Sequence, residues 1–164
     1  MKFVRLFNIL FLICATFSTF AIAQSSSEIR SPESVFGFVP GSDRQLMDYE
    51  ELVDYLLDLS AASDRVEMRE AGTSPLGRTM YVAFISAPEN LDRLDELQEI
   101  NKRLALDPAI PADERAELVR DGRVFLLETL SMHSGEVAPS QSLPIFAHDM
   151  ATTEDPEILA RLNN

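Results

Sequence analysis

The hydrophobic and polar positions along this chain predict several helices. The clearest begins after Asp48, a natural N-cap residue with Glu51 three positions later, as in a capping box. The apolar residues that follow share one helical face: Leu52, Val53, Leu56, Leu57 and Leu59. A charged amphipathic helix is expected over residues 90–106, and a short helix ends at Gly122. A last short helix is expected over residues 155–164.

Three further segments have the composition of β-strands. Residues 65–72 and 79–88 are joined by a connection containing Gly and Pro, so they predict a β-hairpin. Residues 123–130 (RVFLLETL) form a near-continuous apolar run, which is typical of a strand at a sheet centre covered on both faces. A helix over about residues 140–152 follows, with Pro144 near its start, where a missing N–H is tolerated. This order predicts an α/β domain, a mixed β-sheet flanked by helices.

The N-terminus has the three parts of a secretory signal peptide. A basic region at Lys2 and Arg5 precedes a largely apolar run, and residues 21–23 (AIA) supply the small-x-small pattern that signal peptidase reads. The run is shorter than the ~20 apolar residues of a bilayer span, which disfavours the alternative of an uncleaved anchor. We therefore predict a signal peptide over residues 1–23, a secreted or periplasmic protein, and no stable membrane anchoring after cleavage.

Residues 24–35 are polar and rich in serine, so we expect a disordered linker there and a folded portion over residues 36–164. The chain of 164 residues carries 14 basic and 27 acidic side chains, a net charge of −13. Such a field repels nucleic acid and anionic membranes, so neither is expected as a partner. Cys14 is the single cysteine and lies in the predicted signal peptide, which excludes disulfides, cysteine zinc sites and thiol nucleophiles from the mature chain.

The stretch LSMHSGEVA contains the main candidate for chemistry. His133 and Glu136 are three residues apart, a spacing at which both side chains can reach one metal ion from a turn or first helical turn. Imidazole and carboxylate are ligands of hydrolytic zinc sites, which use three protein ligands and leave one position for water. The pair follows the expected buried strand, where open α/β sheets place their ligand sites. Because His-x-x-Glu is a short pattern, a loop with only local hydrogen bonds stays an alternative.

Residues 123–164, with an apolar run before His-Ser-Gly-Glu and a helix after it, resemble the region around the first two zinc ligands of the zinc carboxypeptidases of the carboxypeptidase A type. Residues 49–86 resemble the opening helix and hairpin of that family. Its Gly-x-Ser-x-x-Gly-Arg turn is similar to residues 72–78 (GTSPLGR) here. The similarity extends over residues 36–164.

This resemblance implies a secreted zinc metallocarboxypeptidase, which uses Zn²⁺ to hydrolyse the C-terminal peptide bond of a peptide or protein substrate. It assigns His133 and Glu136 as the first two zinc ligands. The third ligand and the general-base glutamate of the family come from further along the fold. We therefore expect an N-terminal portion of the catalytic domain that is inactive alone and holds no catalytic residue. His148 lies where the family has no ligand, so we expect an exposed or partly packed helix residue.

A second hypothesis belongs to a different class of function. The chain would be a non-catalytic secreted module, derived from such an enzyme, that binds a partner through the acidic helical insertion at residues 89–122. The coding frame beyond Asn164 distinguishes the two hypotheses. A further strand, a distant histidine and a late glutamate would favour the enzyme, and a true stop codon would favour the module.

Overall fold

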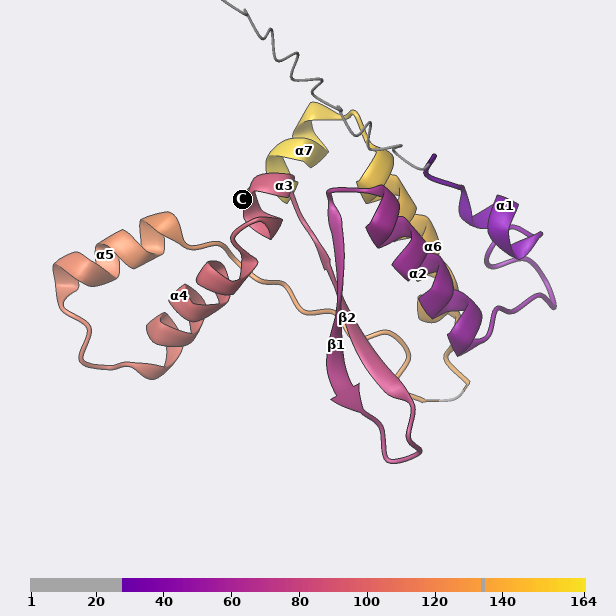
Figure 1. Ribbon diagram of the computed structural model, residues 1–164, viewed down its shortest axis with the longest axis horizontal. Coiled ribbons are helices and arrows are strands. Elements are labelled where there is room, and N and C mark those ends of the chain that lie inside the picture. The colour runs from indigo at the N-terminus through magenta and orange to yellow at the C-terminus, as the bar shows by residue number, and fades with distance from the viewer. Residues whose placement is uncertain (1–27, 134) are drawn as a thin grey trace, which may run out of the picture.

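The structure is a computed structural model that describes residues 28–133 and 135–164. The predicted signal peptide and the start of the predicted linker lie outside these residues. The described elements are, in order, α1 (Pro32–Phe36), α2 (Tyr49–Ala62), β1 (Val66–Thr73), β2 (Thr79–Ile85), α3 (Pro88–Leu91), α4 (Leu94–Leu106), α5 (Ala112–Asp121), α6 (Val137–Thr152) and α7 (Pro156–Leu162) (Figure 1).

Helix α2 begins where the capping pattern predicted. The Asp48 carboxylate accepts a hydrogen bond from the backbone N–H of Glu51 (2.8 Å), and the Glu51 carboxylate accepts one from the N–H of Asp48 (2.9 Å). Both halves of the capping box are therefore formed. The helix buries three residues of the predicted apolar face, Leu52, Leu56 and Leu59. It also buries Tyr55, which was not among them. Leu57, which was expected on that face, is instead 39% exposed.

The main core lies where α2 packs against α6 and β1 (Figure 1). Helix α6 contributes Ala147 and Ala151, whose small side chains allow the two helices to approach closely. Val66 of β1 and Met47 complete the buried cluster, and other apolar side chains pack partly buried around it. This core joins the start of the chain to its last third.

Tyr55 is the polar residue most deeply placed in this core. Its ring packs against that of Phe36 with centroids 5.4 Å apart, and its hydroxyl donates a hydrogen bond to the carbonyl of Arg30 (3.2 Å). Burial raises the pKa of Tyr55 to about 12, and the negative charge of Asp149 adds to the rise. The folded protein therefore favours the neutral phenol.

The free energy of unfolding should fall between pH 10 and pH 12 because of Tyr55. With a folded pKa above its ordinary value of 10.0, the side chain contributes its full stabilisation below pH 10 and loses it as the pH rises through about 12. The expected loss is about 2–3 kcal/mol. Urea unfolding at a series of alkaline pH values measures it, with Tyr55→Phe as the control that lacks the titrating hydroxyl. Equal losses in both proteins would contradict this assignment.

The predicted hairpin is confirmed. Strands β1 and β2 pair antiparallel from Val66↔Ile85 to Thr73↔Thr79, with a register shift between Glu70 and Gly72. One face of the hairpin places Val66, Met68 and Ile85 against α2. The opposite face carries Arg69 and Phe84, with the guanidinium carbon 5.6 Å from the ring centroid. The expected combination of helices and strands is therefore present.

The buried strand predicted over residues 123–130 is wrong. These residues have no regular secondary structure, and the sheet of the described residues contains only β1 and β2. Val124, Leu126 and Leu127 are 87%, 82% and 77% exposed. A central strand needs a neighbour on each side for its backbone groups, and the described residues provide neither. The mixed sheet expected from the sequence is therefore not formed by them.

Two helix boundaries also differ from the prediction. The helix expected over residues 90–106 is divided into α3 and α4, because Arg93 has a non-helical φ of −120°. Helix α6 starts at Val137 and not near residue 140, so Pro144 lies inside the helix rather than near its start. Proline has no N–H, so the helix lacks one backbone hydrogen bond at this position. Pro144 is fully buried there, and its apolar contacts offset that loss.

The predicted linker over residues 24–35 is partly helical. Ser31 caps α1, with its hydroxyl oxygen 3.3 Å from the backbone N–H of Ser34, and Pro32 occupies the first helical position. A serine N-cap followed by proline favours a helix start, which explains why this polar segment becomes helical at residue 32.

Helices α5 and α7 confirm the predicted short helices that end at Gly122 and follow Asp155.

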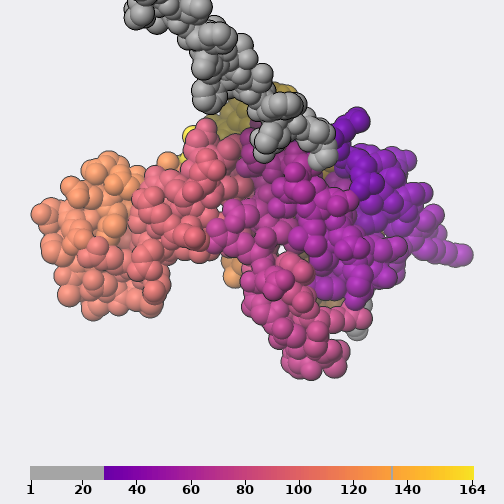
Figure 2. All heavy atoms as spheres, in the orientation of Figure 1, coloured from indigo at the N-terminus to yellow at the C-terminus, as the bar shows by residue number. Residues whose placement is uncertain are grey.

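Helices α4 and α5 form a lobe, hereafter the α4–α5 lobe, that projects from the rest of the molecule (Figure 2). Leu94, Leu97 and Ile100 of α4 are buried, together with Ile110 in the connection to α5. Helix α5 buries no residue. The lobe is therefore held mainly by one apolar face of α4.

Candidate metal centre

The His-x-x-Glu motif forms a turn immediately before α6. The backbone N–H of Glu136 donates a hydrogen bond to the carbonyl of His133 (3.0 Å), and the hydroxyl of Ser131 donates one to the carbonyl of Glu136. Ser131 adopts a left-handed conformation with φ of 61°, which is uncommon for a residue other than glycine. These contacts fix the direction in which the motif meets the helix.

The Glu136 carboxylate is held by the backbone of the same turn. Its Oε2 atom accepts hydrogen bonds from the N–H groups of Met132 (2.9 Å) and His133 (3.0 Å). Its Oε1 atom lies 2.8 Å from Nδ1 of the His133 ring. The hydrogen bond with the His133 side chain, followed by those from the backbone, holds the pKa of Glu136 below its usual value of 4.5. The carboxylate is therefore ionised at neutral pH, the state in which it binds a metal.

The separation of Nδ1 and Oε1 is close to that of two ligands on one metal ion. Zinc ligands about 2.0–2.1 Å from the metal are roughly 3.3 Å apart in a tetrahedral site. The two atoms here are 2.8 Å apart, so opening by about 0.5 Å brings them to that distance. The side chains of His133 and Glu136 are 74% and 48% exposed, which gives an ion and its water ligands free access. The two side chains therefore lie together, joined by the local hydrogen bonds that the alternative interpretation also predicts, and their role as metal ligands stays a prediction.

No third ligand accompanies this pair in the described part of the chain. Over residues 28–133 and 135–164, no group of three or more His, Cys, Asp or Glu side chains is placed to hold a metal. His148 lies twelve residues after Glu136 along α6, about 18 Å at 1.5 Å per residue. Its side chain is 21% exposed, with Nδ1 3.7 Å from Asp149. His148 is thus a partly packed helix residue, as expected.

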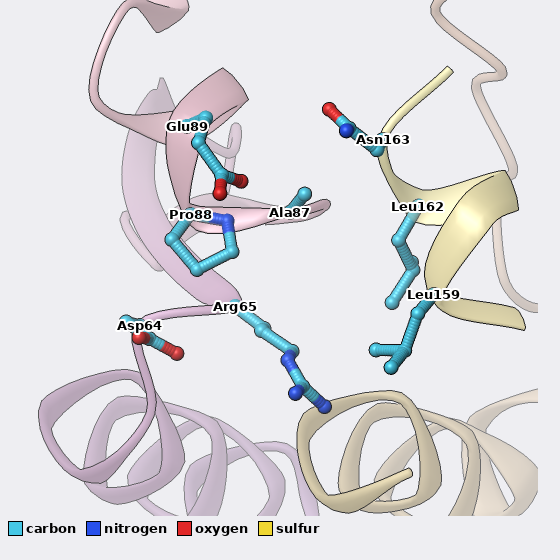
Figure 3. A pocket seen from close by; sticks show the side chains of 8 residues that line it. All are labelled: Asp64, Arg65, Ala87, Pro88, Glu89, Leu159, Leu162 and Asn163. Atoms are coloured by element: carbon cyan, nitrogen blue, oxygen red, sulfur yellow. The ribbon is translucent and has the colours of Figure 1, made fainter. Parts of the chain in front are cut away.

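Sequence reasoning missed a hollow of about 340 Å³ elsewhere in the molecule (Figure 3). Helix α7 forms one side of it, and the connection before β1 together with Ala87 and the start of α3 forms the other sides. Its lining consists of Asp64, Arg65, Ala87, Pro88, Glu89, Leu159, Leu162 and Asn163. No motif marks this hollow, since it exists only because α7 packs beside the hairpin.

The polar groups around the hollow hold elements together. Arg65 donates hydrogen bonds to the carbonyls of Thr153 (2.8 Å) and Ala151 (3.4 Å) at the end of α6. The carbonyl of Leu162 accepts hydrogen bonds from the backbone of Ala87 (3.0 Å) and from the side chains that follow β2, Ser86 (2.7 Å) and Asn90 (3.2 Å). These contacts have a structural role, so the His133–Glu136 turn stays the candidate site.

Comparison of the chain with models of protein families, with curated proteins and with solved structures found no match. Among the described residues, no helix combines the length and apolar character needed to cross a bilayer.

Proposed function

We propose that this chain belongs to a secreted zinc metallocarboxypeptidase, in which His133 and Glu136 are the first two protein ligands of Zn²⁺. The single observation that supports this most directly is the hydrogen bond of 2.8 Å between an ionised carboxylate and the Nδ1 atom of a solvent-exposed histidine. The helix and hairpin that precede the site agree with the expected order of elements in that family. The reaction would be hydrolysis of the C-terminal peptide bond of a peptide or protein substrate.

The residues of the turn have separate tasks in this proposal. The backbone N–H groups of Met132 and His133 orient the Glu136 carboxylate and keep it ionised. His133 would supply the nitrogen ligand through Nδ1, which would release the hydrogen that it shares with Glu136 when a metal binds. A zinc ion bound there would act as a Lewis acid toward a carbonyl group and acidify a water molecule. A third ligand and a general base would have to join the two residues for turnover.

The α4–α5 lobe favours a second candidate function, a non-catalytic secreted module that binds a protein partner. The lobe projects from the rest of the molecule, and Leu106 and Val119 on it are 73% and 65% exposed. Its two helices carry acidic side chains in both first turns. A partner would therefore present apolar and basic groups to this lobe.

Zinc titration of the chain at neutral pH tests the metal site. Two ligands should supply about half of the roughly 10 kcal/mol of a complete structural site, so we expect one ion per chain with a Kd of about 0.1–1 mM. Magnesium is the matched comparison, because it prefers six oxygen ligands and keeps its waters. Equal binding of the two metals would mean that only the acidic surface attracts cations, and the proposed site would then be wrong.

A further inference from the structure

The hollow beside α7 combines apolar walls with charged groups. Pro88 lies on one side of the space, and Leu159 and Leu162 of α7 lie on the other (Figure 3). The side chain of Arg65 crosses one end, and Glu89 lies at the opposite end. The volume of about 340 Å³ is at the small end of the range for small-molecule sites, roughly 300–1,000 Å³. The hollow therefore suits a small molecule with an apolar body and polar ends.

Arg65 uses only part of its guanidinium to hold the fold. Its Nη1 group donates hydrogen bonds to the carbonyls of Thr153 (2.8 Å) and Ala151 (3.4 Å). Over residues 28–133 and 135–164, its Nε and Nη2 groups have no acceptor, and no carboxylate forms an ion pair with it. Nε and Nη2 form one edge of a planar fork, a geometry that binds both oxygens of a carboxylate. This end of the hollow can therefore hold one carboxylate group.

The opposite end of the hollow carries hydrogen-bond acceptors. Glu89 directs its carboxylate toward the space, and Asn163 at the end of α7 directs its amide toward it (Figure 3). Glu89 forms no ion pair with any described residue, so its carboxylate is available to a ligand. Carboxylate and amide oxygens both accept hydrogen bonds from an ammonium group. Asp64 and Glu89 together outweigh the positive charge of Arg65, so the lining favours a ligand that brings a positive charge of its own.

We infer that the hollow binds a small zwitterion with an apolar body, a free amino acid or a dipeptide. Nε and Nη2 of Arg65 hold its carboxylate, Glu89 and the amide of Asn163 hold its ammonium group, and its apolar part lies between Pro88 and α7. This site is separate from the proposed metal site and does not depend on it. A free amino acid is also the class of product that the proposed hydrolysis releases.

Titration of the ¹⁵N-labelled full chain with leucine and with leucylleucine at pH 7, followed by NMR, tests the site. At least one of the two compounds should cause saturable shifts of the backbone signals of Ala87 and Asn163, with a Kd of about 1 mM. The tighter of the two shows whether the hollow holds an amino acid or a dipeptide. No saturable shift of these signals with either compound would overturn the inference.

Two derivatives of the bound compound test its charged ends separately. The C-terminal amide lacks the carboxylate that Arg65 holds, and the N-acetyl derivative lacks the ammonium group that Glu89 holds. Loss of a charge-assisted hydrogen bond should weaken the binding of each at least about tenfold. The amide is used in place of a substitution at Arg65, which would also remove the hydrogen bonds to the end of α6. A derivative that bound as tightly as its parent would show that one charged contact is absent and would overturn the inference.

Two matched glutamate variants test the position of the ammonium group. Glu89 follows Pro88 at the start of α3, and Glu33 follows Pro32 at the start of α1, away from the hollow. Both side chains are exposed, so neither substitution should disturb the fold. Glu89→Gln should weaken binding of the zwitterion at least about fivefold, and Glu33→Gln should leave it unchanged. Equal affinities of the two variants would overturn the inference.

Discussion

Replacing His133 with alanine should remove the zinc binding of this chain. The only nitrogen ligand of the proposed site is then lost, and the Glu136 carboxylate alone resembles the many other exposed carboxylates of an acidic protein. Loss of an outer-shell partner already costs 10–100-fold in metal affinity, so loss of a ligand should cost at least about a hundredfold. Isothermal titration with zinc measures the change.

Two further variants make this result specific. His148→Ala removes the other histidine of the chain, about 18 Å along α6 from Glu136, and should leave zinc binding unchanged. Glu136→Gln keeps the size of the side chain but removes the charge, and should weaken binding as well. Unchanged zinc affinity in His133→Ala would contradict the ligand assignment. An equal loss in His148→Ala would point to a general effect on folding.

Leu56→Ala should cause a large loss of folding stability. Leu56 is 4% exposed in the core between α2, α6 and β1, so its truncation removes buried apolar surface and leaves a cavity. The expected loss in the free energy of unfolding is about 3 kcal/mol. A chain of this size is stable by about 5–15 kcal/mol, so the change is readily seen in urea unfolding followed by circular dichroism.

The neighbouring residue is the matched control. Leu57 is on the same helix but 39% exposed, so Leu57→Ala should cost less than about 1 kcal/mol. Both substitutions change helix propensity equally, and the difference between them reports on burial alone. Similar losses for the two variants would mean that α2 does not pack as described.

The parts of the fold that sequence predicted correctly depend on neighbours close in the chain. The capping box joins Asp48 to Glu51, and the hairpin joins strands separated by residues 74–78. In both cases the residues that signal the structure are also the residues that form its contacts. The closeness of His133 and Glu136 is of the same kind, since a spacing of three residues brings them together in a turn.

The failed predictions involve partners far along the chain. The composition of residues 123–130 suits a buried strand, but burial requires strands on both sides, and apolar sequence does not specify where these come from. Proline is typical of the first turn of a helix, which predicts a start of α6 close to Pro144, whereas in the structure tertiary packing holds Pro144 inside the helix. The hollow beside α7 had no sequence signal, because contacts across more than seventy residues create it.

The hydrogen bonds to the carbonyl of Leu162 close a long loop of the chain. Ser86 and Leu162 are 76 residues apart in sequence, and their hydrogen bond holds together the two ends of the segment that lies between them. Arg123, bonded to the neighbouring Asn163, divides this loop into two smaller ones, the first of which contains the α4–α5 lobe and the second residues 124–130, the metal-site turn and α6. Both loops are closed by hydrogen bonds at the same junction. We therefore expect that a displacement of the α4–α5 lobe is not transmitted along the chain to the turn that holds His133.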